Sequence, residues 1–200
     1  MKKVSFNGLV KTMKDKEVYM LIGNGSKNQF KDLRKIKGIV SAMLKDLPIG
    51  SVFLYFGDYP NKKKPDVGYL FKLIREKRPD IIINMIQIAE AESWGVPDFV
   101  NNVYWHTDYT KKCKWGGIVN NQPCSNTKKW VSVHKRCGIK KAFILGGGEI
   151  TLQEFSLIKK HNIDYKYYLV ERKYKGDGKT KVTDNDSLKQ RVGITYGKIK

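Results

Sequence analysis

Apolar runs of strand length alternate along this chain with stretches whose apolar residues recur every three or four positions. The runs are apolar throughout, which is typical of strands buried on both faces of a parallel sheet. The stretches between them have the period of amphipathic helices that cover such a sheet. The pattern predicts an α/β, Rossmann-like single domain with a mostly parallel sheet and helices on both faces. We expect strands at residues 18–22, 52–56, 81–86, 103–105, 141–145 and 167–170, and helices within residues 30–47, 67–74, 130–137 and 149–158.

The alternation is not interrupted by a repeat or a low-complexity linker. Residues 1–172 are therefore expected to form one Rossmann-like nucleotide-binding domain, for the reasons given below. Residues 173–200, rich in Lys, Gly and Asp, are expected to form a basic C-terminal hairpin or tail. The polar, Gly- and Asn-rich residues 111–127 are expected to form a loop.

The formal net charge of +20 indicates that the surface attracts polyanions, and nucleic acid is the first of these to consider. However, 33 of the 39 basic residues are Lys and only six are Arg. Arg is the residue expected where phosphates or bases are bound in a bidentate way, whereas Lys contributes a point charge. Nonspecific nucleic-acid binding through a Lys-rich surface is therefore expected. A dedicated nucleic-acid-binding or packaging protein that uses the α/β fold as a scaffold is the alternative function.

The three cysteines, Cys113, Cys124 and Cys137, form no Cys-x-x-Cys pair, and this usage suits a reducing compartment. No apolar run approaches the roughly 18 residues of a membrane span, and the N-terminus lacks the apolar stretch of a secretory signal. We therefore expect a cytoplasmic protein without a membrane partner. The sequence leaves open whether the chain forms a homo-oligomer.

Three glycines, Gly146, Gly147 and Gly148, follow an expected strand and precede an expected helix that contains Thr151 and Glu154. Glycines let backbone N–H groups approach an anion closely, and the first turn of a helix offers further donors and the positive end of its dipole. The segment is therefore a candidate phosphate site. The Thr-x-x-Glu spacing is equally that of a capping box, which would make the segment an ordinary tight turn before a capped helix.

Ligands of parallel sheets bind beyond the carboxyl ends of the strands, so residues that follow the first two core strands are further candidates. These ligand-binding candidates are Gly23, Gly25, Gly57 and Asp58. A dinucleotide fingerprint fits them poorly, because Asn28 stands where the third glycine belongs and Asp58 comes too late for the ribose-binding acid. The Gly-Lys-Ser/Thr of a P-loop is absent from the sequence.

The segment from Ala142 to Glu154 resembles the Pro-Gly-Gly-x-Gly-Thr-x-x-Glu signature of the Lonely-guy phosphoribohydrolases, members of the SLOG group of nucleotide-binding domains. Gly146 stands at the family's proline and Ile150 at the glycine before the threonine. The resemblance implies a divergent member that places a nucleotide phosphate on Gly147, Gly148 and Thr151 and its ribose on Glu154. It also implies cleavage of an N-glycosidic bond, or sensing of a nucleotide without turnover, with no cofactor.

In that family an arginine from the preceding helix assists the glutamate. The expected helix before the motif offers Arg136 for this role, beside several lysines, so Glu154 and Arg136 are the candidate catalytic residues.

Two other groups of residues contain side chains that can bind a metal ion or stack on a base. His106, Cys113, Cys124, His134 and Cys137 contain only one closely spaced pair, so no metal site is expected. Trp105, Trp115 and Trp130 lie among lysines and tyrosines, and three roles are open to them: stacking on bases, forming a wall of a base pocket, or filling the core.

Overall fold

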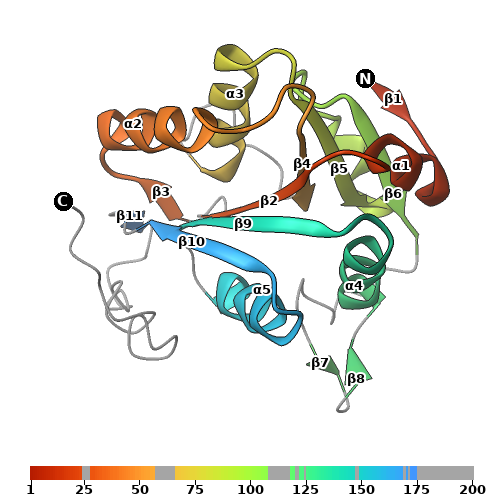
Figure 1. The fold of residues 1–200 in the computed structure, drawn as a ribbon. Helices are drawn as coiled ribbons and strands as arrows, with labels where there is room; N and C mark the ends of the chain where they lie inside the picture. Colours follow the sequence, from red (N-terminus) through yellow and green to blue (C-terminus); the bar gives the residue numbers. More distant parts are fainter. Residues whose placement is uncertain are drawn as a thin grey trace.

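The computed structural model describes residues 1–23, 28–56, 66–107, 118–119, 122–123, 125–146, 149–168, 170 and 172–174 (Figure 1). Predictions for any other residue, including most of residues 173–200, fall outside this part of the chain. Within it, no helix is both long enough and apolar enough to cross a membrane.

The core of the fold is one sheet of seven parallel strands, which confirms the expected α/β architecture. Starting from β2 (Val18–Gly23), the chain adds strands toward one edge of this sheet. It then returns and places the last two strands of the sheet on the other side of β2. In order across the sheet, the strands are β1 (Lys2–Lys3), β6 (Asn102–His106), β5 (Ile82–Ile88), β4 (Val52–Phe56), β2 (Val18–Gly23), β9 (Ile139–Leu145) and β10 (Asp164–Tyr168).

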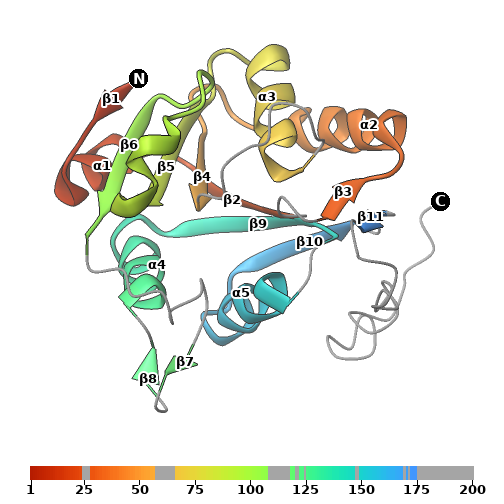
Figure 2. The same cartoon turned by 180° about the vertical axis from the view of Figure 1, so that it is seen from behind.

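Helices cover both faces of the sheet (Figures 1 and 2). One face is covered by α2 (Leu33–Leu44), α3 (Val67–Lys77) and the 3-10 helix η1 (Ala89–Trp94), and the other by α1 (Phe6–Met13), α4 (Ser125–Cys137) and α5 (Glu149–Lys160). Successive residues of a strand point to opposite faces. In β2, for example, Tyr19 and Leu21 pack with α2 and α3, whereas Met20 and Ile22 pack with α1, α4 and α5.

Several elements differ from the expectation. Phe30 lies in a short strand, β3 (Asn28–Phe30), because the side chain of Asp32 accepts a hydrogen bond from Lys35 N and starts α2 after it. β3 pairs with β11 (Arg172–Tyr174) in a separate antiparallel ribbon. The loop expected at residues 111–127 is wrong in part, because it contains β7 (Ile118–Val119), β8 (Gln122–Pro123) and the start of α4.

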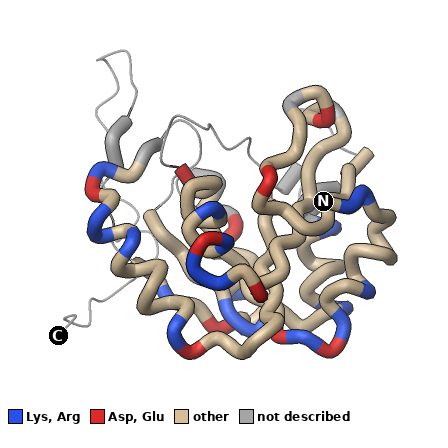
Figure 3. Tube along the Cα trace, turned by 90° about the horizontal axis from the view of Figure 1, so that it is seen from above, with Lys and Arg blue, Asp and Glu red and all other residues tan. Residues whose placement is uncertain are grey.

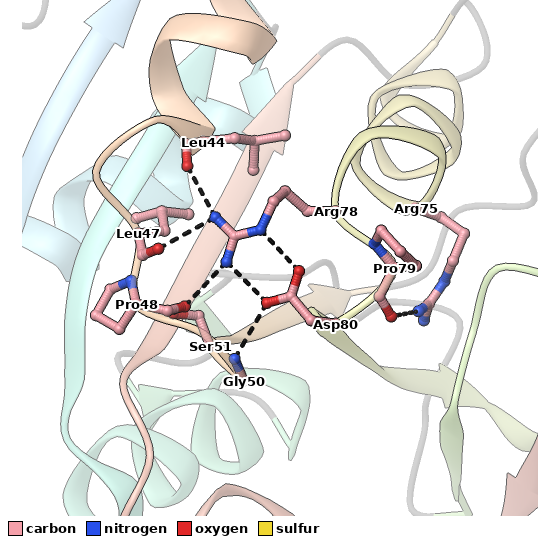
Figure 4. Close-up of polar contacts among 9 residues, drawn as sticks. All are labelled: Leu44, Leu47, Pro48, Gly50, Ser51, Arg75, Arg78, Pro79 and Asp80. Carbon is pink, nitrogen blue, oxygen red and sulfur yellow. Dashed lines mark hydrogen bonds and ion pairs between the residues drawn. The ribbon is translucent and has the colours of Figure 1, made fainter.

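A polar network joins the two loops that lead into β4 and β5 at the amino edge of the sheet (Figure 4). The Arg78 guanidinium forms two 2.7 Å hydrogen bonds with the Asp80 carboxylate and donates to three backbone carbonyls, that of Leu44 at the end of α2 and those of Leu47 and Pro48 after it. Asp80 also accepts from Gly50 N at 3.2 Å. The network adds a donor to carbonyls at and just after a helix end, where the helix itself provides fewer partners.

Candidate functional site

The order in which the chain adds strands to the sheet reverses between β2 and β9, two adjacent parallel strands. Gly23, the last residue of β2, is in register with Leu145, the last residue of β9. Four residues later α5 begins at Glu149, so its N-terminus lies at the carboxyl edge of this strand pair. Open α/β sheets bind their ligands at such a reversal, and a helix N-terminus there attracts anions.

Both strand ends require glycine for a physical reason. A Cβ on Gly23 would lie 3.1 Å from the Leu145 carbonyl oxygen, which is closer than side chains normally approach backbone. Gly146 has a φ of 64°, in the left-handed region that L-residues with a Cβ avoid. Its N–H donates to the Tyr168 carbonyl at 3.3 Å, so the turn is tied to the next strand as well.

Two glycine substitutions should change stability in opposite directions. Gly146→Ala is expected to lower the free energy of unfolding by about 1–2 kcal/mol, because alanine is strained at positive φ. Gly38→Ala is the matched control. A Cβ on Gly38, within α2, would meet nothing within 4 Å, so this change should stabilise the protein by about 0.5–1 kcal/mol. Urea unfolding of both variants measures the difference. Equal effects of the two changes would contradict the assigned turn.

Thr151 and Glu154 lie on the face of α5 that packs against the sheet, together with Phe155 and Ile158. Only 3% of Thr151 and 6% of Glu154 is exposed. Because α5 begins at Glu149, Thr151 lies inside the first turn and is not the N-cap residue. The capping-box interpretation of Thr151 and Glu154 is therefore wrong.

The Glu154 carboxyl is buried without a compensating charge. Within the described part of the chain it forms no hydrogen bond and no ion pair. Burial raises the pKa of Glu154 from its ordinary value of 4.5 to about 8. The carboxyl is therefore largely protonated at neutral pH and is able to donate a hydrogen bond.

The carboxyl ends of the strands carry other buried polar groups that the sequence analysis did not select as site residues. Asp66 caps α3, and its side chain accepts from Gly68 N at 2.9 Å. Gln87, near the end of β5, accepts a hydrogen bond from Ile88 N through its side-chain oxygen. His106, the last residue of β6, is fully buried and its ring lies beside that of Tyr104. The signal that would have found Gln87 is a polar residue near the end of an otherwise apolar strand.

The structure does not bring the two candidate catalytic residues together. Arg136 lies in the last turn of α4, and its side chain interacts with α1. It donates to Asn7 Oδ1 at 3.0 Å, and the guanidinium carbon lies 5.5 Å from the centre of the Phe6 ring. The remaining sequence candidates, Gly25, Gly57, Asp58, Gly147 and Gly148, lie outside the described residues.

The other groups considered from sequence lie mainly in the core. Trp105 and Trp130 are buried, as expected for the core-filling role. Trp130 also packs on His134 and His161. The Cys137 thiol lies 3.9 Å from the Val10 carbonyl. Across the described ranges, no three His, Cys, Asp or Glu side chains are placed to hold a metal ion. Cys113, Cys124 and Trp115 lie outside these ranges.

Comparisons with known proteins supply no family. The chain matches no protein-family model and no curated protein sequence.

Proposed function

We propose that this chain binds a nucleotide or nucleotide sugar at the carboxyl edge of the sheet between β2 and β9. The observation that carries the proposal is the buried Glu154 carboxyl, which belongs to the helix that begins at the carboxyl edge of β2 and β9. Within the described residues, the Trp130 indole N–H is buried without a hydrogen-bond partner, whereas several other buried polar side chains are hydrogen-bonded. The Asn84 amide, for example, donates to Thr12 Oγ1 at 2.7 Å and accepts from Asn102 Nδ2 at 2.8 Å. A titratable group whose pKa is strongly shifted by burial is a candidate for a functional site, and Glu154 lies on the helix whose N-terminus attracts anions.

Each part of the proposed site has a separate task. The N-terminal turn of α5, entered through Gly146 and its two following glycines, receives the phosphate on backbone N–H groups. The Thr151 hydroxyl adds a donor to the phosphate. Protonated Glu154 donates to an oxygen of the ribose and, being neutral, does not repel the phosphate. Arg136 is left out of the site because its side chain interacts with α1.

If the bound nucleotide is consumed, N-glycosidic hydrolysis is the reaction that this site suits. Glu154 gives its proton to the departing base as the C1′–N bond breaks, and water adds its hydroxide to C1′ and returns its proton to the carboxylate. Such general-acid assistance contributes about 10²–10⁴ in rate. Glu154→Gln cannot supply the proton, so base release should fall by that factor while the ligand still binds.

Thermal unfolding with a panel of ligands tests binding directly. The panel contains nucleoside monophosphates, ADP-ribose and cyclic nucleotides, with nucleosides that lack phosphate as controls. At about 100 times its Kd a ligand adds roughly 2.7 kcal/mol, which raises the Tm of a chain of this size by about 5–10 °C. The shift should be absent with nucleosides and reduced in Thr151→Val and Glu154→Ala. No shift with any phosphorylated ligand, or an unchanged shift in both variants, would contradict the proposal.

A further inference from the structure

Helix α4 carries a cluster of basic side chains and no acidic residue. Its sequence, from Ser125 to Cys137, contains Lys128, Lys129, Lys135 and Arg136 but neither Asp nor Glu. Helix α2 likewise contains basic but no acidic residues, although Asp32 and Asp46 flank it. Figure 3 shows Lys and Arg positions spread around the described fold, with Asp and Glu positions among many of them. None of the four α4 cations forms an ion pair within the described residues.

Two of these cations are held in place by aromatic rings and an amide. Lys129 Nζ lies 4.8 Å from the centre of the Phe6 ring and 5.6 Å from that of Tyr104. The Arg136 guanidinium carbon lies 5.5 Å from the centre of the same Phe6 ring, and the guanidinium donates a hydrogen bond to Asn7 Oδ1. Contacts of this kind position a cation without neutralising it, since no carboxylate takes part. The two positive charges therefore remain available to an anion.

The basic side chains repeat at a distance that suits a regular polyanion. Lys128 and Lys135 are seven residues apart, as are Lys129 and Arg136, so each pair lies on one side of α4 about 10 Å apart along its axis. A nucleic-acid strand rises about 3.4 Å per nucleotide, so this distance spans about three phosphates.

The neighbouring helix α1 extends the same surface. Asn7, which contacts Arg136, is followed on the same side of α1 by Lys11 and Lys14, four and seven residues later. Both lysines are exposed. Figures 1 and 2 show α1 and α4 side by side on one face of the sheet. We call Lys11, Lys14, Lys128, Lys129, Lys135 and Arg136 the α1–α4 basic patch.

We propose that the α1–α4 basic patch binds the sugar–phosphate backbone of a nucleic acid, as a second site separate from the carboxyl edge. A lipid surface fits the patch less well, because membrane-binding helices also present apolar side chains to the bilayer. The large apolar side chains that the described part exposes are Met1, Leu33, Ile49 and Tyr165, and none belongs to α1 or α4. The apolar side of α4 is occupied in the core, where Trp130 and Val133 are fully buried.

Fluorescence anisotropy with a labelled DNA duplex and a labelled single-stranded RNA, each of about 20 nucleotides per strand, tests the proposal. Affinities are measured between about 50 and 200 mM salt. In Lys128→Ala/Lys135→Ala the slope of log K against log salt should become shallower by about 2, because two phosphate contacts are lost. Affinity at the lower salt concentration should fall at least about fivefold. The arm with the larger loss identifies DNA or RNA as the preferred form.

The matched control is Lys37→Ala/Lys45→Ala, which removes the same charge from two exposed positions on and just after α2, on the other face of the sheet. Its slope should change by less than about 0.5. Equal loss in the two double variants would overturn the proposal, since diffuse charge would then explain binding. Tighter binding to vesicles of phosphatidylcholine with phosphatidylserine than to either nucleic acid would also overturn it, as would the absence of any nucleic-acid binding.

Two further measurements keep this result separate from the nucleotide site. Thermal unfolding of Lys128→Ala/Lys135→Ala should match that of the parent protein, and Lys128→Gln/Lys135→Gln repeats the test with side chains of similar length. The Tm shift caused by a nucleotide should persist in both variants. If the variants lose both the nucleotide-induced Tm shift and nucleic-acid binding, one site serves both ligands. That result would overturn the proposal of a second site.

Discussion

Glu154→Gln is expected to stabilise the protein by about 2 kcal/mol at pH 7. The folded-state pKa of Glu154, about 8, lies above its ordinary value of 4.5, so the folded state binds the proton more tightly than the unfolded state. The free energy of unfolding therefore falls as the pH rises from about 4.5 to about 8. At pH 7 it has fallen by about 3 kcal/mol. Glutamine does not ionise, so the variant does not lose stability in this way as the pH rises. Burial of its polar amide reduces the gain in stability by about 1 kcal/mol.

Urea unfolding at several pH values between about 4.5 and 8 measures the effect. The stability of the Gln variant relative to the parent should grow steadily with pH across this window. Glu76→Gln is the matched control, because Glu76 is exposed on α3 and, among the described residues, forms an ion pair with Lys72 alone. Its stability should stay within about 0.5 kcal/mol of the parent. Parallel pH profiles for the parent and Glu154→Gln would show that the carboxyl is not buried as described.

The same proton governs the proposed ligand affinity. If protonated Glu154 donates to the ribose, nucleotide binding weakens as the pH rises through about 8, where the carboxyl ionises. Binding by Glu154→Gln should not show this decline, because the amide N–H donates at every pH. A stabilising substitution at a buried ionisable residue is the expected signature of a site kept for function rather than for stability.

Arg78→Ala is expected to lower the free energy of unfolding by about 2–4 kcal/mol. The change deletes every hydrogen bond that the guanidinium forms, and leaves the carbonyls of Leu44, Leu47 and Pro48 and the Asp80 carboxylate without that partner (Figure 4). Partial solvent access limits the loss, since 23% of the Arg78 side chain and 30% of the Asp80 side chain is exposed. Chemical denaturation measures the change.

Two companion variants define the origin of this loss. Lys77→Ala removes an exposed basic residue next to Arg78 in sequence and should change stability by less than about 0.5 kcal/mol. Arg78→Lys keeps the charge but not the planar arrangement of donors, so it should lose more than half of the stability lost in Arg78→Ala. Full stability in Arg78→Lys would show that the charge alone matters and would contradict the role of the carbonyl contacts.

The ion pair also predicts a pH dependence. Hydrogen bonding to Arg78 lowers the pKa of Asp80 from its ordinary value of 3.8 to about 2. Because the folded-state pKa is lowered, the stabilisation is complete above about pH 4 and is lost as the pH falls toward 2. Arg78→Ala should flatten this part of the stability profile.

Local sequence patterns predicted most of the fold because they record periodicity and burial. The apolar run at residues 52–56 is β4, and the helical stripe that starts at Val67 is α3. Phe30 was misplaced because an apolar residue at helical spacing was extended across Asp32, whose side chain starts α2. β1 contains no apolar residue from which a strand could be predicted. Its Lys2 and Lys3 side chains are exposed, and the segment is held by backbone bonds such as that from Lys2 N to the Asn101 carbonyl at 2.7 Å.

The sequence likewise predicted only part of the candidate site. Glycine at positions 23 and 146, and a helix that begins soon after, were predicted because turn chemistry and strand ends are local properties. The sequence also determined that Thr151 and Glu154 share a helix. Only the tertiary structure decided that Glu154 is buried without an ionic partner in the described part and that Arg136 faces α1. Those outcomes depend on which distant segments meet, and the backbone hydrogen bonds that align such segments have no signature in the side chains.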